Sequence, residues 1–168
     1  MRNPIFILAG LIGLIIVLNG CGLKSEEDAL AGAKATAENI FHNESQIETN
    51  YELGNNTIYI PEYLEIESSD ESNLILVNGD QTYILFRNPI ETSQSELNFH
   101  AANAENALLL DSFSNEDNFG YIRILPDEGE GYEMQIGVGG VKITTFTTKG
   151  KMDADAEELM KMAKSIVM

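Results

Sequence analysis

The segment YEMQIGVGGVKITTFT, Tyr132 to Thr147, decides the fold because its own residues define how it pairs. Glycine tolerates the positive φ angle that a two-residue hairpin turn requires, so we expect the turn at Gly139-Gly140. The cross-strand pairs on one face are then mostly apolar: Val138 and Val141, Ile136 and Ile143, Met134 and Thr145, and Tyr132 and Thr147. The pairs on the other face are mostly polar: Gln135 and Thr144, and Gly137 and Lys142. This pattern predicts an antiparallel hairpin with one face in the core.

The glycines of this segment also have the look of a phosphate-binding loop. Gly137-Val138-Gly139-Gly140 is glycine-rich, as such loops are. A phosphate-binding loop opens a helix and carries a Lys-Ser or Lys-Thr pair, and neither follows here. We therefore interpret the glycines as a tight turn and expect no nucleotide site.

A second hairpin is expected earlier in the chain. The apolar runs Asn73–Val77 and Gln81–Phe86 flank Asn78-Gly79, a pair that is typical of hairpin turns. Each run has four apolar residues in succession rather than an alternation. Strands that are apolar on both faces are usually covered on both faces. We therefore expect this hairpin to be central, with helices on at least one side.

The rest of the chain predicts the same class of fold. Further strands are expected at 56–60, 63–67, 107–113 and 119–125, a helix at 92–106, and a closing helix from 152 with Asp153 as its cap. The fold class is therefore α+β, a single domain with an antiparallel sheet of about seven or eight short strands flanked by helices. We expect this globular domain to span 51–168.

An N-terminal helix is expected at 25–45, before the sheet. Ser25 can cap it, and acidic residues follow the cap. Its large apolar residues, Leu30, Ile40 and Phe41, are sparse among alanines. We therefore expect this helix to pack loosely or to form part of a tether.

The first residues are typical of an export signal. Arg2 is followed by an unbroken apolar and glycine run from Ile5 to Leu18. This run is shorter than the roughly 20 residues that a membrane-spanning helix needs. It has no polar face, so it is unlike a helix buried in a globular core. A positive start followed by a short apolar segment predicts a signal peptide over 1–20.

The chain has one cysteine, and its position agrees with that prediction. Leu18-Asn19-Gly20-Cys21 resembles the bacterial lipobox, in which Leu stands three residues before Cys and a small residue directly before it. Asn19 stands where Ala, Ser or Thr is more usual. The resemblance implies that the Cys21 thiol receives a diacylglyceryl group and that the signal is cleaved between Gly20 and Cys21. Residues 21–24 would then be a lipidated tether, and two acyl chains make a stable anchor.

Charge and cysteine content exclude several classes of partner and site. The formal net charge is −17, and loss of Arg2 with the signal would make it more negative. So acidic a surface repels nucleic acid and anionic lipid headgroups, so we expect no nucleic-acid partner. A cationic partner or a divalent metal is compatible with the charge, but a generally acidic surface explains it more simply. A single cysteine provides neither a disulfide nor a zinc cluster.

No motif in the sequence indicates a reaction. His42 and His100 fall on separate expected helices, and the one local partner is Glu38, four residues before His42. The acidic stretches Ser68–Glu71 and Asp127–Glu130 lack the alternating ligands of a calcium loop. No metalloprotease or serine-hydrolase motif is present, although a catalytic triad need not be local in sequence. We expect no cofactor, no metal ligands and no catalytic residues.

A resemblance to a known fold family adds to this interpretation. The segment TIYIPEY, the later strand meander and the closing helix with MAKSI are similar to PsbP-like α/β/α sandwich domains and to small bacterial lipoproteins of unknown function. The resemblance covers most of 55–168 and lies in general shape. It implies the fold and no catalytic residue.

Together these observations predict a lipoprotein held on the outer side of the cell membrane by Cys21. Its single domain would have a non-catalytic interaction or accessory role at the cell envelope, with an envelope protein as partner. Two alternatives stay open: a lipoprotein that binds a small solute or cation, and a hydrolase with a dispersed site. A large apolar pocket would favour the first alternative, and titrating residues around a histidine would favour the second. An exposed apolar patch would favour a protein partner.

Overall fold

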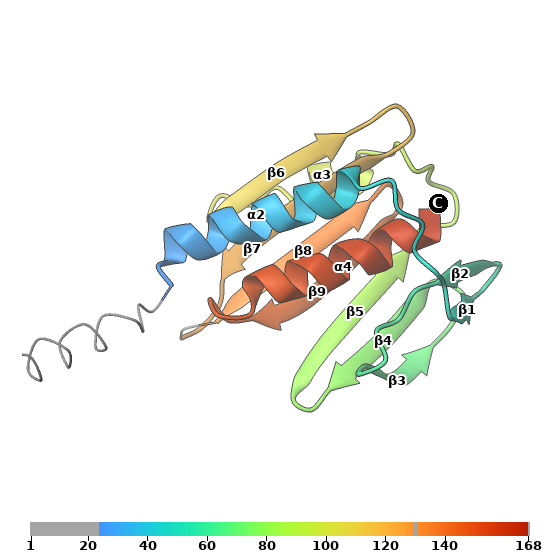
Figure 1. The fold of residues 1–168 in the computed structure, drawn as a ribbon, viewed down its shortest axis with the longest axis horizontal. Coiled ribbons are helices and arrows are strands. Elements are labelled where there is room, and N and C mark those ends of the chain that lie inside the picture. Colours follow the sequence, from blue (N-terminus) through green and yellow to red (C-terminus); the bar gives the residue numbers. More distant parts are fainter. Residues whose placement is uncertain (1–23, 130, 168) are drawn as a thin grey trace, which may run out of the picture.

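A computed structural model describes residues 24–129 and 131–167 (Figure 1). The expected signal segment, its cleavage position at Gly20 and the expected lipid attachment at Cys21 lie outside the described residues. The helices are α2 (Glu26–His42), α3 (Leu97–Ala101) and α4 (Met152–Val167). The strands are β1 (Tyr51–Leu53), β2 (Asn56–Ile58), β3 (Glu65–Ser69), β4 (Asn73–Asn78), β5 (Gln81–Arg87), β6 (Leu109–Ser114), β7 (Phe119–Pro126), β8 (Tyr132–Val138) and β9 (Val141–Thr147).

The described strands form two antiparallel sheets. The larger sheet has seven strands in the order β3-β4-β5-β9-β8-β7-β6, and β1 and β2 form a separate two-stranded hairpin. Helices α2 and α4 lie side by side across one face of the large sheet (Figure 1). The chain is therefore a single α+β domain, as the sequence predicts.

The β8–β9 hairpin has the predicted register. Val138 pairs with Val141, Ile136 with Ile143, and the register continues to Tyr132 and Thr147. Gly139 has a φ angle of 53°, the left-handed conformation that the turn requires. The apolar face of the hairpin lies beneath the helices.

The β4–β5 hairpin differs from the prediction in the position of its turn. Asn78 pairs with Gln81, so the turn residues are Gly79 and Asp80, one position later than the predicted Asn-Gly pair. Gly79 has a φ angle of 58°. The hairpin lies inside the sheet, but its burial alternates along both strands, and the Ile84 side chain is 51% exposed. The hairpin is therefore central with helices on one side, as predicted, and its other face stays open because α2 and α4 share one face.

Helix α2 belongs to the core, so the prediction of a loosely packed helix or tether was wrong. Its buried residues are spaced four apart and are almost wholly inaccessible: Ala29, Ala33, Ala37 and Phe41. Small side chains at this spacing make a flat strip that lets α2 pack closely beside α4. The predicted Ser25 cap is present, because the Ser25 hydroxyl accepts a hydrogen bond from the Asp28 amide.

Helix α4 lies beside α2 and packs on β8 and β9. Its apolar face, which includes Leu159, Met160 and Ala163, is fully buried. The helix begins at Met152, so Asp153 lies within its first turn and is not the predicted cap. Instead the Asp153 carboxylate forms an ion pair of 2.5 Å with Lys24, which ties the start of α2 to the start of α4.

The helix predicted over 92–106 is reduced to the five residues of α3. Side chains before it bond to the β6–β7 turn instead of favouring a helix: the Ser93 hydroxyl donates to the Asp117 carbonyl, and the Gln94 amide donates to the Glu116 carbonyl. Such side-chain to backbone bonds compete with helix formation. Phe99 of α3 packs against Tyr121 with ring centroids 6.0 Å apart, on the side of the sheet away from α2 and α4.

Candidate functional site

The sheet face opposite α2 and α4 is only partly covered. The α3 segment covers part of β7 through Phe99, whereas β4, β5 and β9 present apolar side chains to solvent. Ile84 is 51% exposed and Phe146 is 55% exposed. We call this surface the open sheet face, and its exposed or half-buried residues are Ile75, Val77, Ile84, Phe86, Thr144 and Phe146.

The strand pairing brings these residues together. Ile75 lies opposite Ile84, and Ile84 lies opposite Thr144, so three adjacent strands contribute one continuous row. Phe86 lies opposite Lys142, whose Nζ atom is 5.4 Å from the centroid of the Phe86 ring. Contiguous apolar surface of this kind is typical of an interaction site.

One border of the open sheet face is acidic. Strand β3 is exposed along its whole length and lies beside β4 at the edge of the sheet. The strand and the turn after it carry the exposed side chains of Glu65, Glu67, Asp70 and Glu71. Within the described residues, none of these carboxylates takes part in an ion pair with a basic side chain.

An open hollow of about 720 Å³ adjoins the open sheet face beside the β4–β5 turn. Ile84 and Phe146 form its apolar part, and Asp80 and Lys151 stand beside them. The hollow is therefore continuous with the open sheet face and extends the surface that a partner could contact.

A buried carboxylate joins α4 to the sheet. Asp155 accepts hydrogen bonds from the hydroxyls of Thr147 and Tyr83, at 2.6 and 3.2 Å, and from the Gln81 amide at 3.2 Å. Burial, with the neighbouring Asp155 charge next in importance, raises the pKa of Tyr83 well above its ordinary value. Tyr83 therefore stays protonated and serves as a donor, so this cluster has the features of a structural link.

The two histidines are not brought together. His42 ends α2, where its ring packs edge-on against Phe41 at 5.1 Å between centroids. His100 is on α3, on the opposite side of the sheet, with its Nε2 atom 3.4 Å from Glu96. No ion pair joins Glu38 to His42. No site that uses both imidazoles can therefore form.

The described ranges contain no group of three or more His, Cys, Asp or Glu side chains that could hold a metal ion. The stretch Ser68–Glu71 lies at the sheet edge, where Asp70 accepts hydrogen bonds from the amides of Ser72 and Asn73, both 2.8 Å long. These bonds lower the pKa of Asp70. In the part of the chain that is described, no helix has both the length and the apolar character to cross a membrane.

Comparison of the chain with models of protein families, with curated proteins and with solved structures finds no match. The resemblances to the lipobox and to PsbP-like domains therefore stay predictions from the sequence.

Proposed function

We propose that this protein is an exported lipoprotein, anchored through Cys21, whose domain binds a protein partner at the open sheet face. The apolar side chains that β4, β5 and β9 expose on the open sheet face, above all Ile84 and Phe146, carry the proposal. The partner has an apolar contact surface with basic side chains along one side, where it meets the acidic border on β3.

Charge favours such a partner over the other occupants of this face. A second copy carries the same strongly negative charge, so two copies repel each other. Anionic lipid headgroups and nucleic acid are repelled for the same reason. A basic protein surface is attracted, and the apolar row gives it area to bury.

The anchor gives the domain a defined position. Lys24 is held to Asp153, and only Gly22 and Leu23 lie between it and Cys21, so three Cα–Cα steps give a reach of about 10 Å at most. Because α2 is packed in the core, it does not lengthen the tether between Cys21 and the domain. The domain would therefore stand close to the bilayer with the start of α2 and α4 nearest the lipid. Confinement there raises its effective concentration for membrane-bound partners.

The experiment uses the full-length protein in its native host, with a photo-crosslinking amino acid at Ile84. We expect a discrete crosslinked species that Phe146→Ser on the neighbouring strand abolishes. A matched change of an exposed apolar residue outside the face, Ile90→Ser, should leave it unchanged, since Ile90 is 88% exposed. The proposed partner would be contradicted if the crosslinking amino acid gave the same product when placed at Ile90. A crosslinked product with twice the mass of the chain would also contradict it.

The anchor has a separate test. Cys21→Ser should release the protein from the membrane fraction or leave the signal uncleaved. A processed Cys21→Ser chain that stays on the membrane would show that another feature holds it there. If the Cys21→Ser form gives the same crosslinks, the encounter does not need the anchor.

A further inference from the structure

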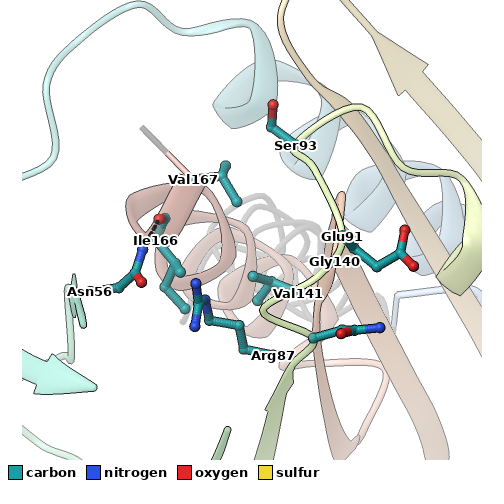
Figure 2. A pocket seen from close by; sticks show the side chains of 9 residues that line it. Asn56, Arg87, Glu91, Ser93, Gly140, Val141, Ile166 and Val167 are labelled. Carbon is teal, nitrogen blue, oxygen red and sulfur yellow. Dashed lines mark hydrogen bonds between the residues drawn. The ribbon is translucent and has the colours of Figure 1, made fainter. Parts of the chain in front are cut away.

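A cavity of about 290 Å³ lies where β5 and α4 both end, on the helix side of the sheet (Figure 2). It is remote from the open sheet face, which lies on the other side. Six of its lining residues come from β2, β5 and the loop after it, the β8–β9 turn, β9 and α4: Asn56, Arg87, Asn88, Gly140, Val141 and Ile166.

Arg87 supplies the positive charge of this cavity. It follows the buried Tyr83 and Leu85 at two-residue spacing, so its side chain projects to the helix side of β5. Figure 2 shows the guanidinium in the space between Asn56 and Val141. The half-buried Arg87 side chain has no ion pair and no hydrogen bond with any residue of the described chain.

An unpaired guanidinium is unusual in this protein, which has 27 acidic residues and 10 basic ones. The other arginine in the described ranges, Arg123, is paired with Glu133. Glu91 also lines the cavity, but Figure 2 shows its carboxylate directed away from Arg87, and it accepts a hydrogen bond from the Ser95 hydroxyl. The protein thus leaves the five N–H donors of Arg87 unused although carboxylates are abundant.

The wall beside Arg87 is held firmly. The Asn88 amide donates to the Gly140 carbonyl at 2.9 Å, and a Cβ atom on Gly140 would lie 2.8 Å from the Asn88 carbonyl oxygen. The Asn88 side-chain oxygen accepts a bond of 3.1 Å from the Ile90 amide, which leaves its NH₂ group as a donor. A rigid wall with a second donor lowers the entropy cost of binding a ligand.

We propose that this cavity binds a small aliphatic monocarboxylate, with its carboxylate on the Arg87 guanidinium. Guanidinium and carboxylate match as a two-pronged pair. One cation in so acidic a protein favours a single negative charge over a dianion such as phosphate. Val141 and Ile166 form the small apolar part of a mostly polar lining, so the ligand that fits has a short hydrocarbon body.

The test is an amide chemical-shift titration of the full chain in non-ionic detergent with isovalerate. We expect saturable, millimolar binding with the largest shifts at Gly139, Gly140 and Asn88. Isoamyl alcohol, which has the same hydrocarbon body without the carboxylate, should not bind. Arg87→Gln should weaken isovalerate binding about tenfold or more, and Arg87→Lys should weaken it less.

Two controls keep the outcome decisive. Asn88→Ala keeps the charge and removes one donor, so it should weaken binding severalfold even if Arg87→Gln alters the local fold. Lys149→Gln removes an exposed positive charge outside the cavity and should change nothing. Equal binding of isoamyl alcohol, tighter binding of inorganic phosphate, unchanged binding by Arg87→Gln, or no saturation would each overturn the proposal. The crosslinking test of the open sheet face is unaffected by any of these results.

Discussion

The Phe41 ring occupies the space that a side chain on Gly120 would need. A Cβ atom built on Gly120 would lie 2.7 Å from two carbon atoms of the ring, which is itself 1% exposed. Gly120 is on β7 and Phe41 is at the end of α2, so the missing side chain of one allows the helix to sit on the sheet. This contact makes α2 part of the fold.

Gly120→Ala should therefore destabilise the domain by about 1–3 kcal/mol, the usual cost of overpacking a core. Denaturant unfolding measures this free energy. The control is Gly150→Ala, where no atom lies within 4 Å of the added Cβ, so the effect should be small or slightly stabilising. Equal stability of Gly120→Ala and the parent would mean that Phe41 does not pack against β7 as described.

The buried Asp155 leads to a second prediction. Asp155→Asn keeps the side-chain volume but replaces one accepting oxygen with an NH₂ group. This group cannot accept the hydrogen bonds that Thr147, Tyr83 and Gln81 donate to Asp155. Loss of a hydrogen bond to a buried charged group costs about 1–3 kcal/mol, so unfolding should need correspondingly less denaturant. Asp127→Asn, at an exposed position, is the matched control and should change stability little. A neutral result at Asp155 would show that α4 docks without this cluster.

Stability should fall at alkaline pH. Burial raises the pKa values of Tyr83 and Tyr121 well above the ordinary value of about 10, because both side chains are almost wholly inaccessible. The folded state thus holds these protons more tightly than the unfolded state. This stabilisation is fully present below pH 10 and is lost as the pH rises through the folded pKa values.

Denaturant unfolding at a series of pH values measures this loss. Tyr121→Phe removes one titrating hydroxyl, so its stability should fall less steeply above pH 10 than that of the parent. Equal slopes for the two proteins would mean that Tyr121 titrates alike in the folded and unfolded states.

The sequence predicted the structure correctly where neighbouring residues by themselves determine the strand pairing. Gly139-Gly140 and the alternation around it determine the β8–β9 register, and every predicted pair is present. The β4–β5 turn moved by one residue, because Gly79 rather than Asn78 takes the positive φ angle. The four apolar residues in succession on these strands indicated burial on both faces, yet burial depends on which elements lie above each face.

The open sheet face could not be predicted for the same reason. The face is exposed because the segment between β5 and β6 covers only part of it. In that segment Phe99 packs against Phe119 and Tyr121 of β7. For α2 the sequence held a signal of close packing that a count of large apolar residues does not detect. Alanines at four-residue spacing, ending in Phe41, mark a helix that packs closely on another helix.

That spacing gives the last prediction. Ala33 is fully buried on the face that α2 turns to the core, and Ala35 is exposed on the same helix. Leucine is as good a helix former as almost any residue, so Ala→Leu changes packing more than helix propensity. Ala33→Leu should therefore cost about 1–3 kcal/mol of unfolding free energy, whereas Ala35→Leu should cost little. Equal melting temperatures for the two variants would make α2 a loosely attached helix. The tether that we propose after Cys21 would then include α2, and the domain could stand farther from the membrane.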